Sequence, residues 1–143
     1  MNRAPLDRSW LLEHLPHGAR MNLLDAIVSW DATSVRALAR NHRSPDHPLR
    51  RAGELPIASG IEYAAQAAAA HGALASRLPA GAGLLASVRS VVFHARRLDD
   101  AAGDLEVFAE HLGGSDAGVV YRFEVASAGR MLVEGRLTVA FPR

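Results

Sequence analysis

The feature that most constrains the fold is an alanine-rich, almost wholly apolar stretch near the middle of the chain, at residues 55–70. We expect a helix here, running from about residue 56 to residue 77. It carries one carboxylate, Glu62, and one carboxamide, Gln66, which are four residues apart and therefore share one helix face. Because a glutamate is rarely buried without a partner, we interpret Glu62 as a functional acid. The alternative is an exposed first-turn glutamate that the helix dipole favours.

Most of the remaining chain is typical of β-strands separated by turns. We expect strands at residues 21–30, 32–40, 84–98, 105–112, 118–126 and 131–141, although the second of these also fits helical periodicity. A short helix at residues 7–15 precedes them, with Asp7 as its cap, and the polar segment 41–54 is expected to be a loop.

The order of these elements predicts the fold class. Four consecutive strands joined mostly by short turns require an antiparallel sheet, and one long apolar helix needs a sheet to cover it. The sequence therefore predicts a single α+β domain over residues 1–143, with a curved antiparallel sheet of about six strands around one long central helix.

Composition excludes several classes of function. The chain has no cysteine, which excludes disulfides, thiolate zinc sites and a cysteine nucleophile. The formal net charge is +1, which does not favour nucleic acid as a partner. The N-terminal residues lack the apolar stretch of a signal peptide, and no apolar run approaches the length of a membrane span, so we expect a cytoplasmic protein that does not bind membranes.

Three motifs, in this order, resemble a known family. The first is LPHGARMNLLD at residues 15–25, and the second is the EYAAQ helix at residues 62–66, with Pro56 six residues before the acid. The third is a strand at residues 89–98 followed by AGDLE at residues 102–106. Together they resemble the 3-hydroxyacyl-acyl carrier protein dehydratases of the FabA/FabZ type, which have the hotdog fold. The pattern is more similar still to the ApeP-like dehydratases of aryl polyene pathways.

This resemblance implies a lyase that dehydrates 3-hydroxyacyl thioesters in fatty-acid or aryl-polyene-type synthesis. Such chemistry needs an acid and a base, and the resemblance assigns these roles to Glu62 and His47, contributed by different protomers. It further implies a homodimer or higher assembly, or a hetero-oligomer with another dehydratase. The expected substrate is a thioester of acyl carrier protein or of coenzyme A, and neither a cofactor nor a metal is expected.

The resemblance also suggests residues that bind the substrate and its carrier. Gln66 and His17 are candidates for positioning the substrate, and backbone N–H groups at Ser59 and Gly60, or near Gly83, for the thioester oxygen. Arg50, Arg51 and Arg96 are candidates for an acidic carrier protein or a pantetheine phosphate.

One departure from the family pattern concerns the histidine. The position fourteen residues before Glu62 is Pro48, and His47 lies one residue earlier. Either a one-residue loop insertion restores His47 to the site, or the histidine function is lost. Two other hypotheses follow: a hotdog acyl thioesterase that uses Glu62 without His47, and a non-catalytic hotdog subunit that partners a true dehydratase.

Overall fold

The computed structural model describes residues 5–15, 18, 20–75, 84–115 and 118–140. Its helices are α1 (Arg8–His14), the 3-10 helix η1 (Asn41–Arg43) and α2 (Ser59–Leu74). Its strands are β1 (Ala26–Trp30), β2 (Ser34–Ala39), β3 (Leu84–Phe93), β4 (Leu105–Ser115), β5 (Gly118–Ser127) and β6 (Arg130–Ala140). No helix in these ranges is long and apolar enough to cross a membrane.

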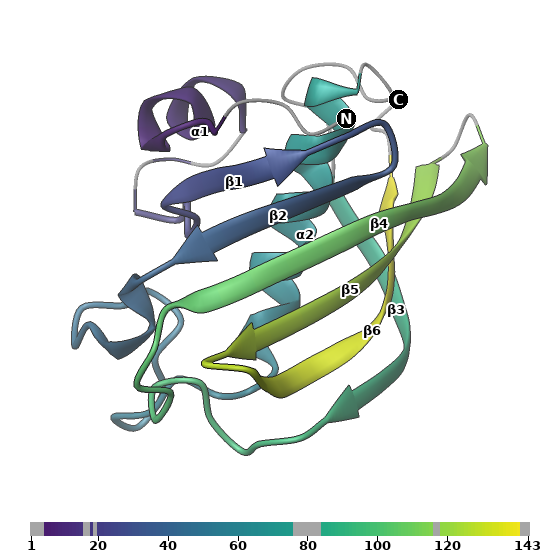
Figure 1. Cartoon of the computed structure of the whole chain (residues 1–143). Coiled ribbons are helices and arrows are strands. Elements are labelled where there is room, and N and C mark those ends of the chain that lie inside the picture. Colours follow the sequence, from purple (N-terminus) through teal and green to yellow (C-terminus); the bar gives the residue numbers. More distant parts are fainter. Residues whose placement is uncertain (1–4, 16–17, 19, 76–83, 116–117, 141–143) are drawn as a thin grey trace.

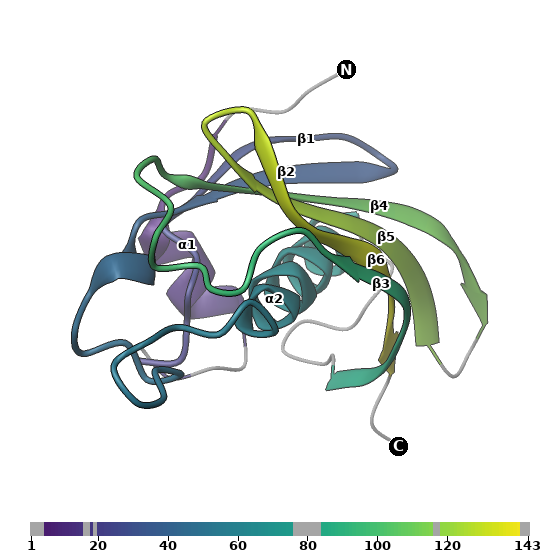
Figure 2. The ribbon, with the colours of Figure 1, turned by 90° about the horizontal axis from the view of Figure 1, so that it is seen from below.

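The six strands form one antiparallel sheet in the order β1-β2-β4-β5-β6-β3. The sheet curves around α2, as Figures 1 and 2 show from two directions. The predicted α+β architecture, a curved sheet around one long helix, is therefore confirmed. The strands that are consecutive in sequence from β4 to β6 pair through short turns, as their spacing predicts.

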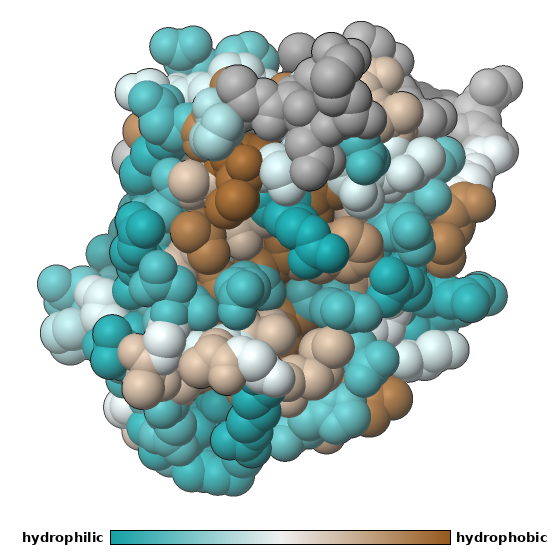
Figure 3. Space-filling model, viewed as in Figure 1, coloured by the Kyte–Doolittle hydropathy of each residue, from teal (hydrophilic) through white to brown (hydrophobic). Residues whose placement is uncertain are grey.

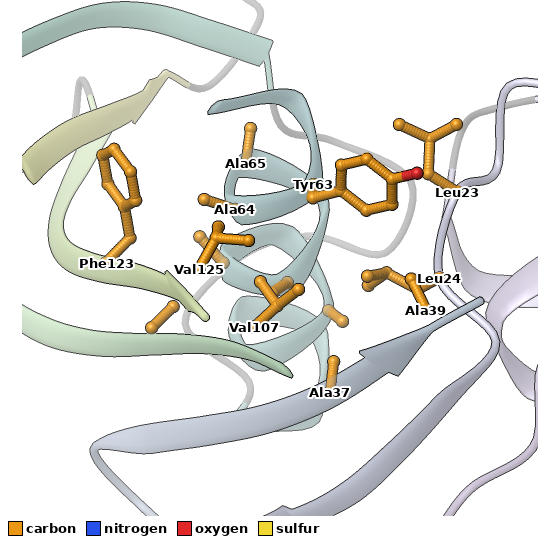
Figure 4. Close-up of a cluster of buried hydrophobic side chains, with 14 of the residues drawn as sticks. Leu23, Leu24, Ala37, Ala39, Tyr63, Ala64, Ala65, Val107, Phe123 and Val125 are labelled. Atoms are coloured by element: carbon orange, nitrogen blue, oxygen red, sulfur yellow. The ribbon is translucent and has the colours of Figure 1, made fainter. Parts of the chain in front are cut away.

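Small side chains let α2 lie close to the concave face of the sheet. Ala64, Ala67 and Ala68 of the helix are completely buried. Figure 4 shows Ala64 and Ala65 near Phe123 and Val125, whose side chains point from β5 toward the helix. Alanine is a strong helix former that adds little bulk, so the same residues favour the helix and its close packing.

The two faces of the sheet differ in composition because successive side chains along a strand alternate between them. On β5, Tyr121 and Phe123 are buried, whereas Arg122 between them is only partly buried. Figure 3 shows the outer face of the sheet as largely hydrophilic, with apolar patches between the charged groups. Arg122 and Arg36 both stack over the ring of Phe108 on this outer face, with guanidinium-to-centroid distances of 5.0 and 4.6 Å.

Several predicted boundaries differ from those observed. The first strand begins at Ala26 rather than at residue 21, because Met21 and Leu23 form hydrogen bonds with the side chain of Gln66 instead of with a strand. β3 ends at Phe93 rather than at residue 98, and α2 begins at Ser59 rather than at about residue 56. The predicted cap of α1 is confirmed, since the Asp7 carboxylate accepts a hydrogen bond from the Trp10 N–H at 3.2 Å.

Strand β3 lies at one edge of the sheet and has β6 as its neighbour. It exposes large apolar side chains: Val88, Val92 and Phe93 are 40%, 49% and 49% exposed. Its pairing with β6 shifts register between Arg89 and Val92, where Ser90 has a positive φ of 55°. Unpaired strand edges invite pairing with another chain, so this edge is a candidate interface.

Candidate functional site

A groove of about 740 Å³ lies where the start of α2, the segment after His47 and the edge strand β3 approach one another. Glu62 and Ser59 line it from α2, Leu49 and Arg51 from the loop, and Val88 from β3. Because one side of the groove follows the unpaired edge of the sheet, a second subunit placed against β3 would contribute to its wall.

The Glu62 carboxylate is half-buried at the first turn of α2. The positive end of the helix dipole favours its negative charge. The Gln66 carboxamide lies one turn later and donates from Nε2 to Glu62 Oε1 at 3.3 Å and to the Met21 carbonyl at 2.7 Å. Gln66 Oε1 accepts from the Leu23 N–H at 2.8 Å. Gln66 thus ties the carboxylate to the segment that precedes β1.

The expected backbone donors at Ser59 and Gly60 are already engaged in a turn. The Ser59 N–H donates to the Pro56 carbonyl and the Gly60 N–H to the Ile57 carbonyl, each at 2.9 Å. Gly60 is buried against β6, where a Cβ atom would lie 2.7 Å from Val133 Cγ1. The geometry therefore explains the glycine by close packing of the helix on the sheet.

His47 is 5% exposed and forms hydrogen bonds through both ring nitrogens. Nδ1 accepts from the Leu49 N–H at 3.1 Å, and Nε2 lies 2.8 Å from the Tyr63 hydroxyl. That hydroxyl donates in turn to Asn41 Oδ1 at 2.6 Å. Since Nδ1 is an acceptor, a neutral ring carries its proton on Nε2 and donates it to Tyr63. This fixes the direction of the two side-chain hydrogen bonds: His47 donates to Tyr63, and Tyr63 donates to Asn41.

The surroundings of His47 favour its neutral form. Burial, followed by the charges of Arg50, His42 and Arg20, lowers the pKa of His47 to about 4. A proton on Nδ1 would also face the Leu49 N–H. Burial likewise raises the pKa of the Tyr63 hydroxyl, with a contribution from the charge of Asp25. Both side chains are therefore uncharged near neutral pH.

The three candidate carrier-binding arginines differ in their engagement. Arg50 donates to the carbonyls of Ser44 and Gly53 at 2.7 and 2.6 Å and approaches Asp99 at 3.4 Å. Arg96 pairs with Glu54 at 2.6 Å. Arg51 is exposed on the groove wall, and no ion pair involves it within the part of the chain that the structure describes.

The Asp99 carboxylate, 5% exposed at its side chain, joins the loop to the segment after β3. It accepts hydrogen bonds from Arg97 and from the Leu55 N–H, and the Arg97 hydrogen bond is the main reason that the pKa of Asp99 lies well below its usual range. Asp99 therefore fixes one wall of the groove.

His17 and Gly83 lie outside the described residues.

The sequence pattern did not point to Tyr63 or Asn41, whose hydrogen bonds determine which ring nitrogen of His47 carries the proton. The available signal was a hydroxyl-bearing aromatic residue in an alanine-rich helix, directly after the acid. Across the described ranges, no group of three or more histidine, aspartate or glutamate residues could hold a metal ion.

Comparison with known proteins gives a match to one protein family and similarity to several solved structures. Residues 11–143 match the ApeP-like family, described as ApeP dehydratase. The chain is similar to a structure of the dehydratase heterocomplex ApeI:P from Xenorhabdus doucetiae, with 25% identity, a TM-score of 0.77, and coverage of 93% of this chain and 91% of that chain. No curated protein matches the sequence significantly.

More distant structures share the fold. The zebra fish thioesterase superfamily member 2 is 13% identical with a TM-score of 0.64, and the match covers 93% of this chain and 91% of that chain. A thioesterase protein with coenzyme A from Streptococcus pneumoniae TIGR4 is 14% identical with a TM-score of 0.58, over 81% and 84% of the two chains. At these identities the likeness concerns the hotdog-type fold alone.

Proposed function

The chain belongs to the ApeP-like dehydratase family, and we propose that it is a cytoplasmic dehydratase subunit that acts on 3-hydroxyacyl thioesters of acyl carrier protein. We infer fatty-acid or aryl-polyene-type synthesis as its setting. The observation that carries this proposal is the Glu62 carboxylate on the first turn of α2, in a groove bordered by apolar side chains.

Dehydration of a 3-hydroxyacyl thioester removes a proton from the α-carbon and the hydroxyl group from the β-carbon. An acid that protonates the departing hydroxyl accelerates the second event, and a base is needed for the first. We assign the acid to Glu62, which Gln66 holds in place. The base is then a second group that faces Glu62 across the groove.

The proposed assembly places the groove between two subunits. The groove includes Val88 of the edge strand β3, and the same strand exposes Val92 and Phe93. The similar chain in the ApeI:P structure comes from a heterocomplex. The first observation supports an assembly through β3, with another hotdog subunit or with a second copy, and the second observation favours a hetero-oligomer.

The proposed carrier contact is Arg51, which is exposed on the wall of the groove. A guanidinium group suits the phosphate of a pantetheine arm or a carboxylate of an acidic carrier protein. Arg50 and Arg96 contribute to the proposal through the shape of the loop and the local positive charge, since both already bind acceptors of the chain itself.

Glu62→Gln is the direct test of the proposed function. The complex is purified from source cells through a tag on this chain and assayed for enoyl product with a 3-hydroxyacyl-acyl carrier protein. Loss of the acid should lower the rate by about 10²–10⁴-fold. The control is Glu106→Gln, because Glu106 is exposed on the outer face of the sheet, and its rate should be unchanged.

The same assay tests the thioesterase alternative. A hotdog thioesterase would release the free thiol of the carrier without forming an enoyl product. Thiol release that depends on Glu62, in the absence of dehydration, would replace our proposal with the thioesterase. Equal dehydration by wild type and Glu62→Gln would remove Glu62 from the mechanism.

A further inference from the structure

Three arginines lie side by side on the outer face of the sheet, across β5, β6 and β3. Arg122 is opposite Arg136 in the strand register, and Arg136 is opposite Arg89. Residues that are opposite one another on neighbouring strands share a face, with Cβ atoms about 4.5–5.5 Å apart. Arg122 stacks over Phe108 on the outer face, so all three side chains lie on the side of the sheet away from α2 (Figure 2). We call these residues the arginine row.

Only part of the charge of the arginine row is neutralised. Like charges directly opposite one another on neighbouring strands are destabilising. Arg122 forms ion pairs through Nε and Nη1 with Glu110 and Glu124. Arg89 and Arg136 are exposed, and no ion pair involves either of them within the described ranges. The row therefore carries two positive charges that no carboxylate of the described chain balances.

The carboxylates next to the row are bound to other groups. Glu124 and Glu134 are opposite one another on β5 and β6, two residues along each strand from the arginines. Glu124 binds Arg122, and Glu134 lies 2.8 Å from Nε2 of His94. The observed side-chain positions thus leave Arg89 and Arg136 available to a negatively charged ligand.

A β-bulge opens a hollow beside the arginine row. The pairing of β3 with β6 shifts between Arg89 and Val92, and Ser90 in the bulge has a φ of 55°, which few residues other than glycine adopt. A hollow of about 160 Å³ lies here, and its lining includes Ser90, Val92, Arg122, Glu134 and Arg136. Bulges commonly direct side chains into functional sites, and this bulge places a serine beside two arginines.

The size and charge of the hollow favour a compact dianion. Its volume is below the range of about 300–1,000 Å³ that is typical of pockets for drug-sized ligands, so it suits one small group rather than a whole organic molecule. A carboxylate carries one negative charge and would leave one guanidinium unbalanced. A phosphate group carries up to two, and its oxygens accept paired hydrogen bonds from guanidinium groups.

We propose that the arginine row and the adjoining hollow bind a phosphate group, either as the free ion or as a monoester. This inference does not rest on the proposed function, because the hollow and the Glu62 groove lie on opposite faces of the sheet. Val88 of β3 lines the groove, whereas Arg89 belongs to the arginine row. A phosphate group between Arg89 and Arg136 bridges β3 and β6, and binding therefore strengthens the attachment of the edge strand.

NMR titration of the ¹⁵N-labelled full chain tests the site, with inorganic phosphate and glycerol 3-phosphate as the probes and sodium chloride at constant ionic strength. We expect saturable shifts in residues 89–92, 122 and 134–136. Arg136→Gln and Arg89→Gln should each weaken binding by about tenfold or more, because each removes a charged donor. Arg36→Gln is the matched control, since Arg36 is exposed on the same face without an ion pair among the described residues and does not line the hollow. Its affinity should stay within about twofold of the wild type.

The two probes distinguish the source of the phosphate group. Tighter binding of glycerol 3-phosphate would support a monoester as the ligand, and tighter binding of inorganic phosphate would support the free ion. Shifts that spread over the whole surface without saturation, or equal affinities of wild type and Arg136→Gln, would overturn the proposal.

Thermal denaturation separates a ligand-binding role of Arg136 from a purely structural one. Without phosphate at low ionic strength, Arg136→Gln should melt at the same temperature as the wild type or higher, because it relieves repulsion between like charges. Phosphate should then raise the midpoint of the wild type and leave that of Arg136→Gln unchanged. A lower midpoint of the variant without phosphate would assign Arg136 to the stability of the fold and overturn the proposal.

Discussion

A buried histidine whose two ring nitrogens both form hydrogen bonds stabilises the structure around it and is also a titratable group. In His47 the acceptor nitrogen faces a backbone N–H and the donor nitrogen faces Tyr63. Protonation must break the first of these contacts and place a charge beside Arg50, His42 and Arg20. The residue therefore couples the pH of the solution to the stability of the groove wall.

The sign of this coupling follows from the lowered pKa. The pKa of His47 is about 4 in the folded chain and 6.5 in the unfolded chain, so the unfolded chain binds the proton more tightly. The stabilisation is complete above pH 6.5 and is lost as the pH falls toward 4. We expect His47 to account for a decrease of about 3 kcal/mol in the free energy of unfolding over this interval.

Chemical denaturation at several pH values checks this expectation. The difference between wild type and His47→Gln isolates the contribution of the imidazole from that of the carboxylates, which titrate in both proteins. A difference in unfolding free energy that stays constant from pH 7 to pH 4.5 would contradict the lowered pKa.

At the scale of elements, the distance between α2 and the sheet depends on the small size of the helical side chains. At Gly60 the helix lies directly against β6, where an added Cβ atom would lie 2.7 Å from Val133 Cγ1. The alanines that follow continue this close approach along the helix. Any added atom at Gly60 must move either the helix, with Glu62 on the same turn, or the strand.

Gly60→Ala should therefore destabilise the chain even though alanine favours helices. Overpacking costs about 1–3 kcal/mol, against a gain of about 1 kcal/mol in helix propensity, so thermal denaturation should show a lower midpoint. Gly18→Ala is the control, because a Cβ atom there would meet no heavy atom within 4 Å. An unchanged or higher midpoint for Gly60→Ala would show that the helix can move without cost.

At the scale of the whole molecule, β3 is an edge strand that pairs with β6 on one side and with no other described strand on the other side. One edge strand exposes three large apolar side chains and also borders the groove that contains Glu62. In the proposed assembly, oligomerisation and completion of the site would thus both depend on the same strand. A monomer would present the acid in an open groove, where water surrounds the reacting groups.

Val92→Lys tests the interface. A lysine on this edge should disrupt association, because a charge must be desolvated when the edge is covered. Size-exclusion chromatography with light scattering should show the wild type as an assembly and the variant as a monomer. Leu112→Lys is the matched control, since Leu112 on β4 is 45% exposed and lies away from this edge. Loss of association in the control alone would place the interface elsewhere.

The sequence predicted the fold well because the fold depends on local patterns. Alternation along the strands and the alanine-rich helix determine which faces are buried, and both can be seen without knowing which residues meet in space. The predicted start of β1 was wrong because Gln66, more than forty residues later, forms hydrogen bonds with Met21 and Leu23. Such a contact leaves no periodic signal.

The candidate site was harder to predict for the same reason. Glu62 stood out because it is a lone acid in an apolar helix, but the state of His47 depends on Tyr63 and Asn41, which lie at separate positions in the sequence. Arg50 attracted attention as a surface cation, yet Asp99, 49 residues away, and nearby carbonyls bind it. Distant pairings of this kind become visible only once the chain is folded.

Glu62 and Tyr63 are adjacent in one helical turn but serve different parts of the molecule, the groove and the loop. Evolution can therefore alter the two roles separately. A single exchange of Tyr63 for an apolar residue would release the imidazole without touching the acid, and the reverse exchange would withdraw it. Gain or loss of one phenolic oxygen is thus enough to change how firmly the loop is held, while the acid in the groove stays in place.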